Sequence, residues 1–136
     1  MSLNVRIYGP PVAQGSMKGF VVKGRAILTS NNAAKLKPWR QQIAETAVAA
    51  GAAPLGGPVQ ILCHFYVRRP KGRPKKYGLP DKRPDLDKLL RSVLDALTGI
   101  AYHDDGQIVM ATVYKGYATD DAPEGVWIVV DGGLQK

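Results

Sequence analysis

The chain contains few of the residues that build disulfides, zinc sites or histidine-based metal sites. Its 136 residues include one cysteine and two histidines, so neither an internal disulfide nor a cysteine-rich zinc site is possible. We interpret Cys63 as a small buried hydrophobic residue. His64 and His103 lie 39 residues apart, which does not fit a nuclease with a histidine–metal finger. This composition fits a soluble protein of a reducing cytoplasm.

Long apolar runs are also absent from the sequence. No stretch approaches the roughly 18–20 apolar residues that a membrane span requires. The residues after Met1 do not show a basic segment followed by an apolar one, which would indicate a secretory signal. We therefore expect neither a membrane partner nor secretion.

Acidic residues are outnumbered by basic ones. The chain has 19 Lys and Arg against 11 Asp and Glu, a formal net charge of +8. Such a field attracts polyanions, of which nucleic acid is the commonest. A basic surface that is merely solvated remains the alternative at this point.

The hydrophobic pattern predicts a single α/β domain of the α+β type, with a mixed β-sheet and two main helices. Period-two alternation and turn residues predict strands, whereas period-3.6 patterns predict helices. Over 1–136 there is no repeat and no domain boundary. The expected strands lie at 3–9, 20–22, 26–28, 58–68, 107–115 and 125–131, and the expected helices at 38–50 and 86–98.

The first helix is predicted from its end signals. Pro38 suits a first helical turn and Gly51 the position past a helix end. Residues 30–32 offer capping side chains, and 31–37 are expected to add only an irregular turn. The expected buried side comprises Trp39, Ile43, Ala47 and Ala50.

The second helix shows a complete apolar stripe on one face. Asp87, Arg91 and Asp95 fall on the opposite face at i, i+4 spacings, which favours ion pairs between them. The stripe comprises Leu86, Leu89, Leu90, Val93, Leu94 and Leu97.

A basic segment precedes this helix. Residues 68–83 contain eight Lys and Arg against one acidic residue, Asp81. Interspersed proline and glycine prevent regular structure, and the segment is expected to be flexible in the free protein. Several cations in one loop can contact successive phosphates of DNA. The alternative is a solvated linker without a target.

A pair of aspartates follows the basic segment directly. Pro84 precedes Asp85 and Asp87, so the pair lies where extended backbone turns into helix. Side chains two residues apart can converge there, and Mg²⁺ prefers oxygen ligands of this kind. Stabilisation of the helix start by acidic residues explains the same pair without a metal.

A second acidic pair, Asp104 and Asp105, lies between the second helix and the next strand. A turn with the sequence Asp-Asp-Gly is common without any function. The sequence does not show whether this turn returns to the start or to the end of the helix.

Three short stretches resemble the RusA family of Holliday junction resolvases, found in bacteria and their phages. They are 85–91 (DLDKLLR), 95–99 (DALTG) and 104–108 (DDGQI). A weaker similarity, including the sequence Tyr8-Gly9-Pro10-Pro11, the hairpin and the first helix, extends the match over most of residues 3–115.

The resemblance implies a RusA-like fold and a homodimer that cuts four-way DNA junctions by paired symmetric nicks in recombination and repair. It implies one or two Mg²⁺ ions, for which Mn²⁺ can substitute. It carries the three essential aspartates onto Asp85, Asp87 and Asp105, with Asp104 as a neighbouring acidic position. The family often has lysine where this chain has Arg91, and arginine cannot act as a proton donor.

We therefore hypothesise a metal-dependent endonuclease of a bacterial or phage-infected cell. Arg91 or Lys88 would stabilise charge on the phosphoryl oxygens. Cations of the hairpin and of the loop would bind the DNA arms, namely Lys18, Lys23, Arg25, Arg69, Lys71, Arg73, Lys75, Lys76, Lys82 and Arg83.

Two other readings stay open. The first is a module that binds branched DNA or RNA without cutting it, in which the aspartates only stabilise a helix start. The second is another enzyme with an Asp-x-Asp metal site, such as a nucleotide-sugar transferase. The short chain and the lack of a Gly-rich phosphate loop argue against the second.

Overall fold

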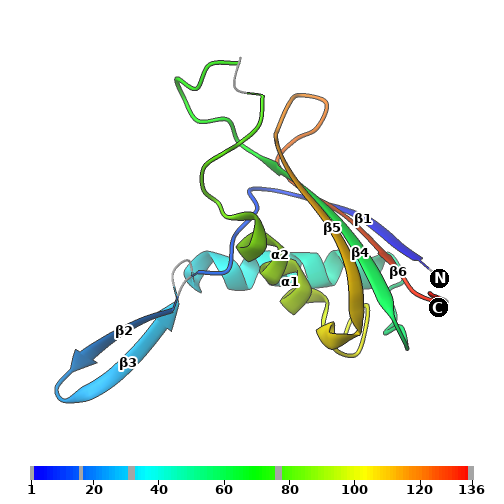
Figure 1. Cartoon of the computed structure of the whole chain (residues 1–136), viewed down its shortest axis with the longest axis horizontal. Helices are drawn as coiled ribbons and strands as arrows, with labels where there is room; N and C mark the ends of the chain where they lie inside the picture. The colour runs from blue at the N-terminus through cyan, green and yellow to red at the C-terminus, as the bar shows by residue number, and fades with distance from the viewer. Residues whose placement is uncertain (1, 16, 31–32, 76–77, 135–136) are drawn as a thin grey trace.

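The chain forms a four-stranded sheet, two α-helices and a separate two-stranded hairpin (Figure 1). This computed structural model describes residues 2–15, 17–30, 33–75 and 78–134. The elements are β1 (Ser2–Tyr8), β2 (Met17–Val22), β3 (Arg25–Ser30), α1 (Ala33–Ala49), β4 (Val59–Val67), α2 (Leu86–Leu97), the short 3-10 helix η1 (Asp105–Gln107), β5 (Ile108–Tyr117) and β6 (Gly125–Asp131). The predicted order of strands and helices and the α+β fold are confirmed.

The main sheet is mixed, with the strand order β1-β6-β4-β5. β6 pairs antiparallel with β1 and β4, whereas β5 runs parallel to β4. Two parallel neighbouring strands need a crossover connection between them, and α2 lies in the connection from β4 to β5. β4 alternates strictly between buried and half-buried residues, as its sequence predicts. The crossover ends in β5, which lies at the edge of the sheet.

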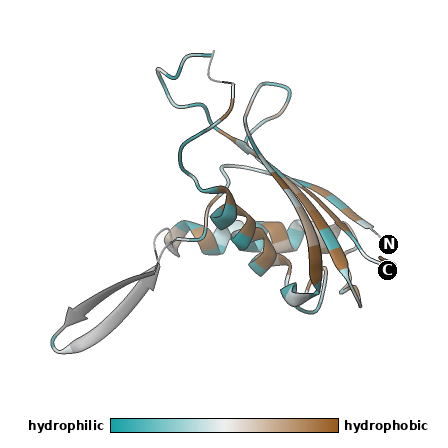
Figure 2. Cartoon of the chain, viewed as in Figure 1, coloured by the Kyte–Doolittle hydropathy of each residue, from teal (hydrophilic) through white to brown (hydrophobic). Residues whose placement is uncertain are grey.

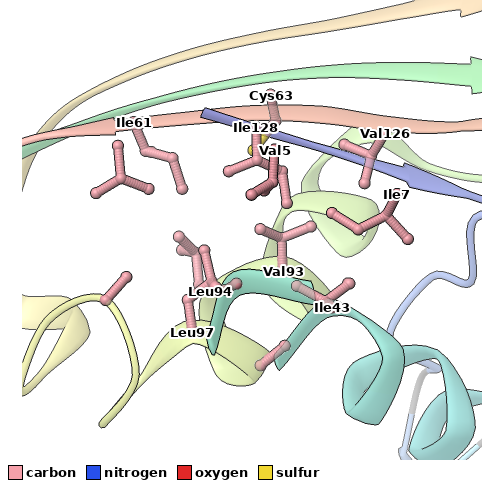
Figure 3. Packing of buried hydrophobic residues seen from close by; sticks show 14 of the residues in the cluster. Val5, Ile7, Ile43, Ile61, Cys63, Val93, Leu94, Leu97, Val126 and Ile128 are labelled. Atoms are coloured by element: carbon pink, nitrogen blue, oxygen red, sulfur yellow. The ribbon is translucent and has the colours of Figure 1, made fainter. Parts of the chain in front are cut away.

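Both helices pack on the same face of the sheet and enclose the hydrophobic core (Figures 1 and 3). Figure 3 shows Ile43 of α1 and Val93 of α2 directed toward Val5 and Ile128 of the sheet. All four side chains are almost completely buried, and each such side chain contributes roughly 1.5–3 kcal/mol through burial. Among the described residues, no helix is long and apolar enough to cross a membrane.

The first helix differs from its prediction at both ends. α1 begins at Ala33, so Pro38 lies inside the helix rather than in its first turn. A proline there loses one backbone hydrogen bond, but the added turn buries Leu36, which is 4% exposed. Ala50 is exposed beyond the helix end, where Gly51 adopts a φ of +90°. The expected caps Asn31 and Asn32 lie outside the described residues.

The second helix and the hairpin match their predictions closely. Leu86 is the exception in the predicted stripe, because the first turn of α2 leaves it 38% exposed. In the hairpin, Lys23 and Gly24 form the turn with φ values of +50° and +76°, the pattern of a two-residue hairpin turn. Lys18 and Arg25 lie in β2 and β3, and the description does not extend to their side chains.

No described helix covers the other face of the sheet, which carries aromatic residues. The Arg6 guanidinium lies 4.6 Å from the Tyr8 ring and 4.4 Å from the Tyr66 ring. His64 stacks on Tyr66 at 4.3 Å between ring centroids. Burial, together with the charge of Arg6, lowers the pKa of His64. This placement supports a structural role for His64.

Candidate active site

The first acidic pair lies where extended backbone turns into α2, as predicted. Asp85 has extended dihedral angles (φ −72°, ψ 135°), and its side chain makes no capping hydrogen bond. Its carboxylate is 47% exposed and lies 3.8 Å from the Nζ of Lys88. Asp87 in the first turn is exposed, and the described part of the chain contains no ion pair to it. Two accessible carboxylates therefore lie at the start of α2.

A lysine from the edge strand secures the chain that leads into this pair. The Nζ of Lys115 in β5 donates hydrogen bonds to the carbonyl oxygens of Lys82 (2.7 Å) and Pro84 (2.8 Å). Lys115 pairs in register with buried Phe65 of β4, so its side chain leaves the sheet on the helix side. Sequence reasoning missed Lys115. The only sequence feature that could have indicated this role is a charged residue in the predicted strand 107–115.

The second acidic pair is held by a glutamine. The Oε1 of Gln107 accepts hydrogen bonds from the backbone N–H groups of His103 (2.8 Å) and Asp104 (2.9 Å). Its Nε2 donates to the carbonyl oxygens of Leu55 (2.8 Å) and Gly57 (2.9 Å). One side chain thus ties the Asp104–Asp105 turn to the segment between α1 and β4. Sequence reasoning noticed Gln107 only as part of a motif.

The carboxylate of Asp104 has a structural role in the same turn. It accepts a hydrogen bond from the backbone N–H of Gly106 at 2.8 Å and so caps η1. A side chain at position 106 would place its Cβ 2.6 Å from this carboxylate, so the carboxylate would have to shift. The cap directs Asp104 toward its own turn.

Arg91 connects the turn to the middle of α2. Its Nη1 lies 2.6 Å from Asp105 Oδ2 and 3.5 Å from Asp95 Oδ1. Arg40 of α1 contacts the same Asp95 at 3.4 Å. The predicted ion pair between Arg91 and Asp95 is present. The other partner of Arg91 is Asp105, where the sequence had predicted Asp87. The hydrogen bond that Arg91 donates to the Asp105 carboxylate is the main cause that raises the pKa of Arg91.

The three aspartates do not form a joint metal cluster in this arrangement. Within the described residues, no three His, Cys, Asp or Glu side chains form a group able to hold a metal ion. In this arrangement the carboxylate of Asp105 is paired with Arg91. Asp85 and Asp87 nevertheless fit a hard cation chemically, because Mg²⁺ commonly takes only one or two carboxylates.

The basic loop between β4 and α2 is irregular, as predicted, but it is braced internally. Arg69 lies 4.1 Å above the Tyr117 ring and donates to the carbonyl oxygen of Pro74 at 3.1 Å. Arg73 forms a 2.6 Å ion pair with Asp81. Lys76 lies outside the described residues. The remaining loop cations that were predicted to bind DNA all have exposed side chains; they are Lys71, Lys75, Lys82 and Arg83. Figure 2 shows much of this loop as hydrophilic.

These features place accessible carboxylates beside a cation-rich loop, and comparison with known proteins agrees. The family model of the endodeoxyribonuclease RusA matches residues 9–130. The chain belongs to the RusA family of endodeoxyribonucleases. The chain is also 34% identical over 131 residues to the uncharacterized protein YqaN of Bacillus subtilis (strain 168), a match covering 87% of this chain and 89% of YqaN.

The RusA family match includes every residue of the two acidic pairs and the whole basic loop. It confirms the resemblance inferred from the motifs and supports a nuclease that acts on DNA. The match begins at Gly9, after β1, and reaches into β6, so it covers β4, β5, most of β6 and both helices as well as the site.

Proposed function

We propose that this RusA-family protein is a Mg²⁺-dependent, structure-specific endonuclease that resolves four-way DNA junctions by paired symmetric nicks. The observation that carries the proposal is the accessible pair Asp85 and Asp87 at the end of a strongly basic loop. Phosphodiester cleavage by metal ions needs such oxygen ligands close to cations that bind the DNA backbone. The activity would serve recombination and repair.

Asp85, Asp87 and Asp105 would hold one or two Mg²⁺ ions, with Mn²⁺ as a substitute. Bound Mg²⁺ would supply Lewis-acid polarisation of the scissile phosphate and activation of a water molecule. Asp105 would join the other two carboxylates only after Arg91 releases it. This exchange is chemically reasonable because the side chains of Arg91 and Asp105 are 49% and 34% exposed, and solvent weakens ion pairs that it can reach.

Arg91 and Lys88 would act on the phosphate itself. Once released from Asp105, the guanidinium of Arg91 could pair with phosphoryl oxygens in two parallel hydrogen bonds. Both cations would stabilise the negative charge that develops on these oxygens during displacement. Arg91 stays protonated at every relevant pH, so its role is electrostatic rather than that of a proton donor.

Binding would involve loop cations and two subunits. Cations of the 68–83 loop and of the hairpin would neutralise phosphates and release counterions, so affinity should fall steeply with salt. A homodimer with twofold symmetry would present two identical sites to a nearly twofold-symmetric junction. Paired nicks would follow from this symmetry.

The decisive experiment is cleavage of a labelled synthetic four-way junction with Mg²⁺, beside a linear duplex of the same sequence. We expect paired nicks in the junction alone, and their loss in Asp87→Asn with junction binding retained. Unimpaired cleavage by Asp87→Asn would contradict the assigned site. Tight junction binding without any cutting would instead indicate a non-catalytic branched-DNA binding module.

A further inference from the structure

A pocket of about 210 Å³ opens beside the start of α2, and the mechanism above uses cations of its lining without using the cavity itself. The basic loop, the Pro10–Pro11 segment after β1 and the β5–β6 connection form its walls. Pro84, which lines the pocket, immediately precedes Asp85. A ligand in this pocket would therefore lie directly beside the proposed metal-binding carboxylates.

The charge of the lining favours an anion. Arg68, Arg73, Lys82 and Arg83 line the pocket, and Glu124 is the acidic residue of the described lining. Arg73 is neutralised by Asp81 at 2.6 Å. The described part of the chain shows no ion pair for the other three cations. A pocket with this excess of positive charge attracts a phosphate group.

The remaining lining favours a flat, apolar group. Five prolines and Tyr117 line the pocket. Arg69 covers the Tyr117 ring at 4.1 Å and so restrains it. Nucleic-acid bases and sugars pack well on aromatic and other flat apolar surfaces. A ligand that carries both an anionic group and a flat apolar group would therefore fit this lining better than a ligand with only one of them.

Hydrogen bonds to backbone carbonyl oxygens preform the walls. Lys115 donates to the carbonyl oxygens of Lys82 and Pro84. The N–H of Ala118 donates to Val67 O at 2.8 Å, and the N–H of Gly9 donates to Glu124 O at 3.0 Å. Each of the three wall segments is thus tied to another part of the fold. Ligand pockets are usually preformed in this way.

We propose that this pocket takes one nucleotide of the DNA strand, adjoining the phosphodiester that is cut. The inference rests on the proposed function for its substrate. Its phosphate would pair with Lys82 and Arg83, and its base would pack on the proline and tyrosine surface. Moving a base out of the stack costs least where pairing is already disturbed, so the pocket would favour branched DNA over intact duplex.

The test is an NMR titration of the full chain in EDTA, where no cleavage interferes. The probe is a 5′-phosphorylated thymidine dinucleotide, with inorganic phosphate as the comparison. We expect amide shifts at Val67, Arg83 and Tyr117, with an affinity at least about tenfold higher than for phosphate, or about 1.4 kcal/mol. Equal affinity for phosphate, or shifts elsewhere only, would overturn the proposal.

A matched pair of double variants sharpens this test. Lys82→Gln with Arg83→Gln removes two cations from the pocket, whereas Lys71→Gln with Lys75→Gln removes two exposed cations of the same loop that do not line it. The first variant should weaken dinucleotide binding about tenfold, and the second less than about twofold. Equal weakening by both would show that only the net charge of the loop matters. Thermal unfolding of both variants controls for folding.

The result is independent of the nuclease assay. Dinucleotide binding without junction cleavage by the wild-type protein would leave the pocket supported and the proposed function refuted. Junction cleavage without dinucleotide binding would support the function and refute the pocket.

Discussion

The two acidic pairs have the same chemistry but opposite surroundings. Asp85 and Asp87 lie exposed at the start of α2, with a lysine 3.8 Å from the first carboxylate. Asp104 and Asp105 are both engaged, one in a backbone cap at 2.8 Å and the other in a 2.6 Å contact to Arg91. The first pair is available to an incoming cation, whereas the second already stabilises the fold.

This difference shows that residue type does not determine whether a carboxylate is available. Each pair depends on one distant side chain for its position. Lys115 holds the chain before Asp85, and Gln107 holds the turn around Asp104. Both anchors, Lys115 and Gln107, form hydrogen bonds to backbone groups and not to the carboxylates. The following predictions test this contrast between the two pairs.

The largest expected effect is the difference in junction cleavage between a substitution of Asp87 and the same substitution of Asp104. Asp87→Asn should lower Mg²⁺-dependent junction cleavage at least about 100-fold, because a metal ligand worth several kcal/mol is lost. Asp104→Asn should keep cleavage within about fivefold, since asparagine can still accept the hydrogen bond of the cap. Cleavage rates on a labelled junction measure both, and the reverse order would refute the contrast.

The next effect concerns the anchor of the second pair. Gln107→Leu removes four hydrogen bonds and should lower the free energy of unfolding by about 2–3 kcal/mol. Urea denaturation measures this loss. Gln41→Leu is the control, because Gln41 is exposed and donates a hydrogen bond to nearby Glu45, so its change should stay within about 0.5 kcal/mol.

Release of Asp105 should improve metal binding. Arg91→Gln removes the cation 2.6 Å from Asp105 and should raise Mn²⁺ affinity by about fivefold to tenfold, since it removes a nearby like charge from the metal site. Calorimetric titration measures the affinity. Arg40→Gln, which contacts Asp95 but not Asp105, should change it less than about twofold. Unchanged affinity in Arg91→Gln would show that Asp105 does not belong to the metal site.

The smallest effect concerns the anchor of the first pair. Lys115→Met removes two hydrogen bonds to backbone carbonyls and should cost about 1 kcal/mol of stability, with a few-fold loss of cleavage. Lys35→Met in α1 is a matched control, since Lys35 is exposed. Equal cleavage by both variants would show that Lys115 does not position Asp85.

Sequence patterns predicted those parts of the fold that depend on neighbouring residues. The alternation of β4 and the stripe of α2 arise from burial on one face, which a period of two or 3.6 residues records directly. The start of α1 did not follow its local signal, because burial of Leu36 outweighs the one hydrogen bond that Pro38 removes. Ala50 and Leu86 were assigned to buried faces by periodicity, but both lie at helix ends beyond the packed area.

In the candidate site, too, positions that depend on neighbouring residues were predicted, whereas contacts between distant residues were not. Asp85 and Asp87 were placed correctly, because their position depends on Pro84 and on the helix that follows. Arg91 was expected beside Asp87, but it contacts Asp105, which lies 14 residues away in the chain. Gln107 and Lys115 were missed as anchors, since Gln107 bonds to carbonyl oxygens 50–52 residues away and Lys115 to carbonyl oxygens 31–33 residues away.

The sequence alone determined the fold class, the cation-rich loop and the two acidic pairs, along with the family motif that connects them. These properties depend on composition and on the spacing of residues along the chain. Only the tertiary structure decided that Gln107 ties the second acidic turn to the segment before β4, that Arg91 holds Asp105 and that a cationic pocket adjoins Asp85. The reason is that each of these features requires side chains and backbone groups from separate elements to meet, and no local pattern encodes such a meeting.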